Sequence, residues 1–291
     1  MTPGGTRRAA LTRRLTWAAL AAALAAAAGL AVAWAVIGRP LLWHGFQTTP
    51  QQALPPPAPD PRVTYAGPFH NVRPDVRYVG DGACDDCHHD LAQSYHKHPM
   101  ARTLTPIARL AASQPYDASV HNPFEAFGSR FRVERDGDAV RHRWTRLDVD
   151  GRPIFENVQE VAYAIGSGIH GYSYLSDRDG FVFQTPISWF EQKHFWGPSP
   201  RFYADILPGR PVPADCLFCH ANRARPVAGT YNRYEEPLSD SCGIGCERCH
   251  GPGELHVRNP GLDAAARLDP TIVNPARLPP PLREAVCEQC H

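Results

Sequence analysis

The first feature of the chain is a long apolar stretch near its N-terminus. Residues 15–38 carry no charge and are mostly Ala, Leu and Val, and they follow Arg7, Arg8, Arg13 and Arg14. A secretory apolar region is usually about 7–15 residues long, whereas about 20 apolar residues span a bilayer. We therefore expect a transmembrane signal-anchor helix over 15–38, with the basic residues 1–14 in the cytoplasm. Cleavage at Ala31-Val32-Ala33 is the alternative.

The middle of the chain alternates between apolar and polar residues with the period of a β-strand. Turn-forming Asp-Gly pairs separate these runs at 136–137, 150–151 and 179–180. The strand-like runs cover residues 131–135, 140–144, 153–156, 171–175 and 181–184. The pattern predicts a small antiparallel β insertion over about 120–210.

The segments on either side of this insertion favour short helices. A helix is expected over 90–98, where Pro99 ends it, and another over 104–112. From Asp215 onward, short loops and proline breaks leave too few apolar residues for an ordinary core. A bound apolar group would have to supply much of the interior there.

Composition adds a proline-rich stalk and excludes one class of partner. Thirty of the 291 residues are Pro, about twice the usual share of roughly 5%, which favours a loop-rich fold. The prolines are dense between the apolar stretch and residue 78, so we expect an extended stalk over 39–77. The formal net charge of +1 gives no basis for binding nucleic acid.

The strongest signal is the pentapeptide Cys-x-x-Cys-His, which occurs four times. We number these motifs 1 to 4 in chain order. They are Cys84, Cys87 and His88; Cys216, Cys219 and His220; Cys246, Cys249 and His250; and Cys287, Cys290 and His291. They use eight of the nine cysteines, and we assign no role to Cys242.

This spacing has a chemical explanation. Thiols about one helical turn apart can bond to the two vinyl groups of one porphyrin, and the next histidine then ligates the iron. Each motif is therefore the attachment signature of one covalent haem c, and the cofactor prediction is four haems. Zinc is the alternative for paired cysteines, but a zinc site does not require His after every second Cys.

Each iron can take a second axial ligand, and methionine is scarce. Met1 and Met100 are the only two methionines, so mostly bis-histidine irons are expected. His256 is the first candidate because it follows a tight Gly-Pro-Gly turn after motif 3. His98 follows motif 1 closely, with His96 and Met100 as competitors, and His170 lies in a glycine-rich loop.

The order of these segments resembles the multihaem cytochromes related to cytochrome c-554. The resemblance covers about residues 78–291 and is carried by residues 78–104, 164–170, 216–222 and 244–256. It is closest to the branch in which such haem modules precede tetratricopeptide repeats. In that family paired histidines ligate neighbouring haems, which supports His98, His170 and His256. Ile169 departs from the family, where a polar residue is more familiar at this position.

These observations predict a fold and a function. We expect a multihaem cytochrome c domain over 78–291 that is loop-rich, with short α-helices around the haems. Anchored to the bacterial inner membrane, it would transfer electrons to redox partner proteins on the periplasmic side. The alternatives are a reductase or oxidase of small nitrogen compounds, and a haem-bearing sensor or scaffold module. Because the chain stops at the motif 4 histidine, we also expect it to be a fragment.

Overall fold

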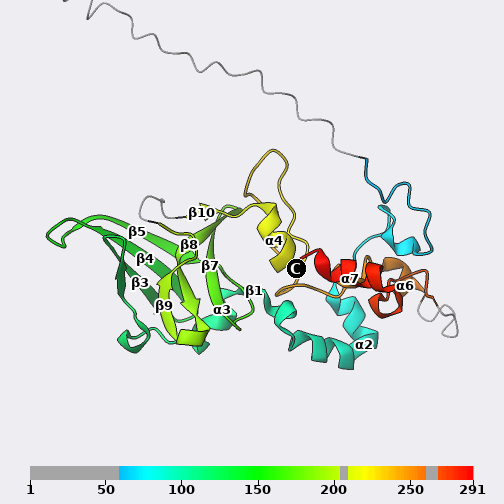
Figure 1. Cartoon of the computed structure of the whole chain (residues 1–291), viewed down its shortest axis with the longest axis horizontal. Coiled ribbons are helices and arrows are strands. Elements are labelled where there is room, and N and C mark those ends of the chain that lie inside the picture. The colour runs from blue at the N-terminus through cyan, green and yellow to red at the C-terminus, as the bar shows by residue number, and fades with distance from the viewer. Residues whose placement is uncertain (1–58, 204–208, 260–267, 291) are drawn as a thin grey trace, which may run out of the picture. The chain divides into compact units, whose positions relative to one another are not determined.

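The computed structural model describes residues 59–203, 209–259 and 268–290 (Figure 1). The predicted segments 1–14 and 15–38, residues 39–58 of the predicted stalk, and His291 lie outside the described residues. Within the described ranges, no helix combines the length and apolar character needed to cross a membrane.

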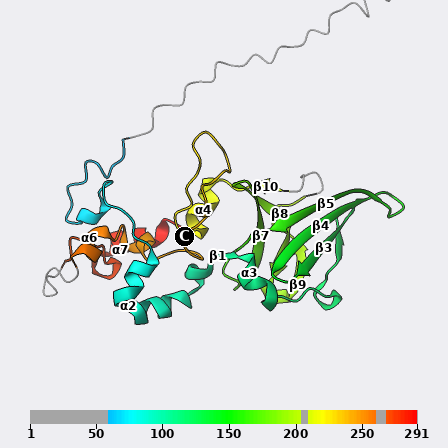
Figure 2. The same ribbon diagram turned by 180° about the vertical axis from the view of Figure 1, so that it is seen from behind.

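The described residues divide into a region of strands and a region of helices. The strands gather on one side of both views, and helices α2 (Asp81–His96), α4 (Ala214–His220), α6 (Glu254–Arg258) and α7 (Pro280–Glu288) gather on the other (Figures 1 and 2). We call residues 104–211 the β region. The described residues 59–103, 212–259 and 268–290 form the motif region, which carries the cysteines of all four motifs.

The β region contains two antiparallel sheets. The larger has the order β1-β6-β7-β8-β10, with β9 also paired to β8, and the smaller has the order β2-β3-β4-β5. The larger sheet consists of β1 (Leu104–Pro106), β6 (Tyr163–Ile165), β7 (Gly171–Arg178), β8 (Phe181–Phe190), β9 (Phe195–Pro198) and β10 (Arg210–Pro211). The smaller consists of β2 (Phe124–Ala126), β3 (Ser129–Asp136), β4 (Ala139–Leu147) and β5 (Pro153–Val161).

The alternating pattern explains the smaller sheet. Along β3, Ser129, Phe131 and Val133 are buried, while Arg130 and Arg132 are exposed, as expected for a sheet with one face on a core. The predicted runs 131–135, 140–144 and 153–156 are confirmed as parts of β3, β4 and β5. The predicted hairpin around Asp179-Gly180 is confirmed as the β7–β8 turn.

The β region also has its own apolar core. Inward side chains of both sheets pack with Ile107 and Ala111, and the largest fully buried members are Trp196 and Tyr174. Strands β5 and β7 approach each other across the two sheets, so this is an ordinary two-layer core. It forms without any apolar group other than side chains.

The predicted helix over 104–112 is wrong at its start. Residues Leu104–Pro106 form β1, which pairs with β6, and helix α3 covers only Ile107–Leu110. Long-range pairing therefore overrides the local pattern at these three residues. The strands also extend beyond the predicted insertion, because β1 precedes residue 120.

The helices of the motif region are short, apart from α2. The predicted helix over 90–98 is the second half of α2, which begins at motif 1, bends at His88 (φ −113°, ψ 38°) and ends at His96. Gly80 precedes this helix with φ +85°, a conformation that favours glycine. The other short elements of the motif region are η1 (His70–Val72), η2 (Pro99–Arg102), α5 (Glu247–His250) and η6 (Pro275–Arg277). The β region contains three further short elements, η3 (Ala111–Ser113), η4 (Ala118–Val120) and η5 (Glu191–Lys193).

A second apolar cluster joins the two regions. Leu217 of α4 is fully buried and packs with Leu104, Leu175 and Val182 of the larger sheet. Backbone hydrogen bonds reinforce this contact, including Leu104 N–H to Cys242 O at 3.1 Å. Motif 2 is therefore held directly against the β region.

Candidate haem sites

Motif 1 lies in the first half of α2. Cys84 is partly buried and Cys87 is exposed, one helical turn apart. His88 follows at the bend of the helix and is also exposed. Positions i, i+3 and i+4 of a helix share a face, so the two sulfur atoms and the imidazole can meet one porphyrin.

The His256 ring of α6 lies opposite the His88 ring. Their centroids are 6.3 Å apart and their planes differ by only 10°. A metal held about 2 Å from one nitrogen of each imidazole would place the centroids about 6 Å apart. The structure thus brings together a motif histidine and the first candidate for a second axial ligand.

The other nitrogen of His256 already has partners. Its Nδ1 lies 3.1 Å from Asp269 Oδ2 and 3.2 Å from Thr271 Oγ1. Burial alone would raise the pKa of Asp269, but hydrogen bonds from Thr271 and the nearby His256 lower it overall. An Nδ1–H that donates to a carboxylate leaves Nε2 free to bind a metal. Asp269 and Thr271 were not predicted, because nothing in the sequence ties them to residue 256.

His250 of motif 3 shows the same arrangement with a backbone partner. Its Nδ1 lies 2.8 Å from the carbonyl oxygen of Val273, which can only accept a hydrogen bond. This bond fixes the proton on Nδ1 and leaves Nε2 as the metal-binding nitrogen. The chain around His250 is held by Asn71, whose Nδ2 donates to the His250 and Pro252 carbonyls. The described end of the predicted stalk therefore packs against motif 3.

Two buried carboxylates connect motif 3 to the start of α2. The Glu247 carboxylate accepts hydrogen bonds from the backbone N–H groups of Val79, Gly80 and Gly253, at 2.7–2.9 Å. Glu254 accepts from the Arg77 guanidinium, at 2.7 Å from its NH2 group, and this bond contributes most to lowering the pKa of Glu254 to about 2. These bonds fix the positions of motifs 1 and 3 and of α6 relative to one another.

Motif 2 ends at a half-buried histidine. Burial lowers the pKa of His220, which favours the neutral imidazole that iron requires. Its Nδ1 is buried and has no hydrogen-bond partner within the described residues. Its backbone oxygen accepts from Thr103 Oγ1 at 2.7 Å, so the chain position is fixed while a ring nitrogen is left unsatisfied.

Motif 4 is described up to Cys290. Cys287 lies in α7, where it is exposed, and Cys290 is partly buried. No side chain of α7 is buried within Pro280–Glu288. The motif 4 histidine, His291, lies outside the described residues.

The structure does not bring His98 or His170 opposite any of the three motif histidines that it describes. His98 is exposed, and its Nδ1 accepts a long hydrogen bond of 3.3 Å from the Met100 N–H. Iron on Nε2 would place the proton on Nδ1 and break this bond. His170 is also exposed, and its Nδ1 lies 3.0 Å from the Gln192 side-chain amide. Within the described ranges, neither ring has a stacked imidazole partner of the kind that His88 has.

The cysteines of different motifs are close neighbours. The Cys84 and Cys246 thiols share a hydrogen bond, which is the main cause of a lowered pKa for Cys84 and a raised one for Cys246. Burial and a hydrogen bond to Cys219 raise the pKa of Cys290. Burial and the nearby Cys287 raise that of Cys249. Cysteines of motifs 1 and 3, of motifs 3 and 4, and of motifs 4 and 2 are therefore near enough to shift one another's pKa.

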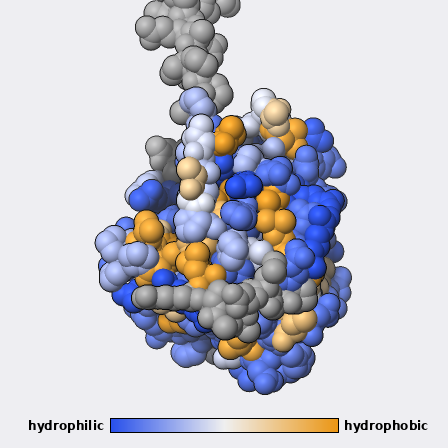
Figure 3. Space-filling view, turned by 90° about the vertical axis from the view of Figure 1, so that its right-hand side faces the viewer, coloured by the Kyte–Doolittle hydropathy of each residue, from blue (hydrophilic) through white to orange (hydrophobic). Residues whose placement is uncertain are grey.

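The surface around the motifs fits a large apolar group. Side chains that globular proteins normally bury are exposed on these elements, including Leu91 (70%), Leu282 (57%) and Phe218 (45%). Apolar patches interrupt the polar surface on the face shown in Figure 3. Together with the unsatisfied Nδ1 of His220, this surface is what porphyrin faces bound at the four motifs would cover.

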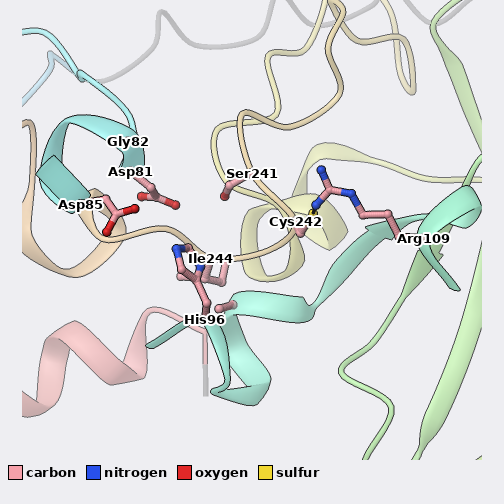
Figure 4. A pocket seen from close by; sticks show the side chains of 9 residues that line it. Asp81, Gly82, Asp85, His96, Arg109, Ser241, Cys242 and Ile244 are labelled. Atoms are coloured by element: carbon pink, nitrogen blue, oxygen red, sulfur yellow. Dashed lines mark hydrogen bonds between the residues drawn. The ribbon is translucent and has the colours of Figure 1, made fainter. Parts of the chain in front are cut away.

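A pocket of about 280 Å³ lies beside motif 1 (Figure 4). Asp81, Asp85 and His96 line it from α2, and Ser241 and Cys242 line it from the segment before motif 3. Arg109 reaches across to Cys242, donating a hydrogen bond of 2.8 Å to its sulfur. Its lining includes Asp85 of motif 1 and Ile244, two residues before motif 3, so the pocket belongs to the surroundings of motifs 1 and 3.

Comparisons with known proteins agree with the motif analysis. Residues 208–251 match the family model described as cytochrome c554 and c-prime, and this segment contains motifs 2 and 3. Two solved structures are similar, each with a TM-score of 0.40. The outer cell wall cytochrome OcwA is 16% identical, with 68% of this chain and 35% of that chain covered. An undecahaem cytochrome from the S-layer of Carboxydothermus ferrireducens is 18% identical, with 74% and 25% covered.

The chain thus spans about a third and a quarter of the lengths of these two structures. No curated protein matched the chain.

Proposed function

We propose that this chain, whose residues 208–251 match the family model described as cytochrome c554 and c-prime, transfers electrons through four covalently attached haem c groups. When bound, such haems supply one-electron oxidation and reduction at their irons. The observation that carries the proposal is the facing pair His88 and His256, at 6.3 Å and 10°.

The axial ligands are assigned from the motif positions and, for His250 and His256, from the hydrogen bonds of their Nδ1 atoms. His88 and His256 are assigned as the two ligands of the motif 1 iron, with Asp269 orienting His256. His250 and His220 are the motif ligands at motifs 3 and 2, and His291 at motif 4. His98 and His170 remain candidates for second ligands, because Met100 is the only methionine in the described residues.

The cysteine contacts support a path for electrons. Cysteines of motifs 1 and 3, 3 and 4, and 4 and 2 shift one another's pKa, so haems bound at these motifs would be neighbours. Electron tunnelling weakens steeply with distance, so the chain's residues set the route by placing these cysteines.

The place of action is part of the proposal. Residues 15–38 would anchor the protein in the bacterial inner membrane, with the haem domain on the periplasmic side, where haem c is attached. Membrane fractionation and protease accessibility of the full chain test this directly. Release of the haem domain into the soluble fraction, without proteolysis, would contradict the anchor.

The function itself is tested on the full chain produced with a haem c attachment system. Intact mass should increase by four haem groups, and the reduced protein should pass electrons rapidly to a soluble acceptor without turning over nitrite or hydroxylamine. Four haems that pass electrons to the acceptor only slowly would instead support the hypothesis of a haem-bearing sensor or scaffold module. Rapid turnover of either nitrogen compound would support the hypothesis of a reductase or oxidase.

A further inference from the structure

Three of the four attachment motifs meet around one arginine. Arg248 is the second variable residue of motif 3, and its guanidinium lies 3.7 Å from the ring centroid of Phe218 in motif 2. It also donates a hydrogen bond to the Phe218 carbonyl oxygen. On its other side it contacts the Cys290 thiol of motif 4, where its hydrogen bond and charge oppose the rise in pKa that burial causes.

The backbone of Arg248 is tied into the same junction. Gln289 of motif 4 donates to the Arg248 carbonyl at 3.3 Å, and Arg248 N–H donates to Gly245 at 3.1 Å. The side chain is therefore held from two motifs besides its own. The packing of motifs 2, 3 and 4 therefore fixes the position of this side chain, which does not rotate freely as an exposed arginine would.

The charge of Arg248 has no counter-charge in the part of the chain that the structure describes. No carboxylate there lies within 4.0 Å of its guanidinium, and its buried Nε has no hydrogen-bond partner. By contrast, Arg223 and Arg225 both pair with Asp240, at 3.2 and 3.1 Å. An arginine side chain stays protonated at every physiological pH, so one unpaired positive charge is fixed at the junction.

Haem c would be attached through its vinyl edge, with its propionates on the opposite edge of the porphyrin. Arg248 precedes Cys249 in the chain and lies beside Cys290, so it would be nearer to the attachment edge than to the propionates of the haems at motifs 3 and 4. Reduction adds one electron to an iron, and a nearby fixed positive charge in a poorly solvated site favours that reduced state.

We propose that Arg248 raises the reduction potential of the haems attached at motifs 2, 3 and 4. The inference rests on the proposed function, since it requires haems at these motifs. It gives the haems at motifs 2, 3 and 4 a higher potential than the haem at motif 1, so electrons that enter at motif 1 move toward this group of three.

The test is a spectroelectrochemical titration of the haem-loaded full chain and its variants. Arg248→Gln should lower the reduction equilibrium constant of at least one haem about tenfold, which is 59 mV for one electron. Arg248→Lys keeps the charge and should retain most of the wild-type potential. Arg233→Gln is the matched control, because Arg233 also lies over an aromatic ring, Phe181, but in contact with the β region. It should leave all potentials unchanged.

The outcomes separate this inference from the proposed function. A wild-type chain without four reversible haems contradicts the function. Four haems with wild-type potentials in Arg248→Gln overturn the role of Arg248, and an equal shift in Arg248→Lys overturns its electrostatic origin. If Arg248→Gln does not load four haems, Gln289→Glu places a negative charge at the same junction. A lower potential in that variant supports the inference, and an unchanged one overturns it.

Discussion

The β region and the motif region are stabilised by different means. The β region buries aromatic and branched side chains between two sheets, with Trp196, Tyr174 and Val140 fully inaccessible. In the motif region, α2 buries only Ala92, and α7 buries no side chain. The first region can fold on side-chain packing, whereas the second needs the apolar faces of bound cofactors. One chain thus combines an ordinary scaffold with a region completed by its prosthetic groups.

The largest effect is expected when haem attachment is prevented, and it should differ between the two regions. A full chain with all eight motif cysteines changed to Ala should retain slow hydrogen exchange in β3, β4 and β8. The amides of α2 and α7 should exchange at close to unprotected rates, because no burial protects these helices. Mass-spectrometric hydrogen exchange measures both at once. Equal protection of the two regions, or equal loss, would contradict the comparison.

The next effect should be confined to the β region. Trp196 is fully buried and its indole N–H donates to the Pro115 carbonyl at 2.9 Å. Trp196→Ala should cost about 3–5 kcal/mol of unfolding free energy, measured by denaturant titration with circular dichroism. The half-exposed Trp144 serves as control, and Trp144→Ala should cost clearly less. Haem absorption should be unchanged in both variants, and loss of haem from Trp196→Ala would show that the regions are not independent.

A pH effect also belongs to the β region alone. Complete burial lowers the pKa of His142 to about 3, from an ordinary value of 6.5. The unfolded chain therefore binds the proton below pH 6.5 while the folded chain does not, so stability falls as pH decreases from 6.5 toward 3. The loss is at most about 5 kcal/mol at the acid end. His142→Phe should flatten this part of the stability profile, and an unchanged slope would sink the prediction.

The smallest effect concerns a polar connection in the motif region. Glu247 is buried and accepts three backbone hydrogen bonds from the segments around motifs 1 and 3. Glu247→Gln replaces one acceptor oxygen by a donor, which should cost about 1–3 kcal/mol. The readout is thermal unfolding of the motif region, monitored by hydrogen exchange of the α2 amides. Glu235→Gln removes an exposed ion pair with Arg225 as control and should cost less than about 1 kcal/mol.

The sequence predicted the parts of the fold that have a local cause. The strands β3 and β4 alternate cleanly, and Asp-Gly pairs mark their turns. The start of the predicted helix over 104–112 was wrong because β1 forms only through pairing with β6, more than fifty residues away. Pairing partners at that distance leave no trace in the local pattern.

The candidate site divides in the same way. The four motifs predicted the cofactor, and the turn after motif 3 predicted His256 as a second axial ligand. The identity of its facing ring, His88, depends on how α2 and α6 pack and could not be read from spacing. Asp269 and Arg248 were missed for related reasons: one acts through a distant contact, and the other occupies a variable position of its motif.

The most direct test of the account is the spin state of the irons in the haem-loaded full chain, measured by electron paramagnetic resonance. His256→Ala should convert one iron from low spin to high spin while intact mass still shows four haems. The control is His89→Ala, since His89 is an exposed neighbour of His88 that is hydrogen-bonded to Asp85. This variant should leave the spin state of every iron unchanged. If all irons remain low spin in His256→Ala, or if His89→Ala gives the same high-spin signal, the assignment of His88 and His256 as an axial pair is wrong.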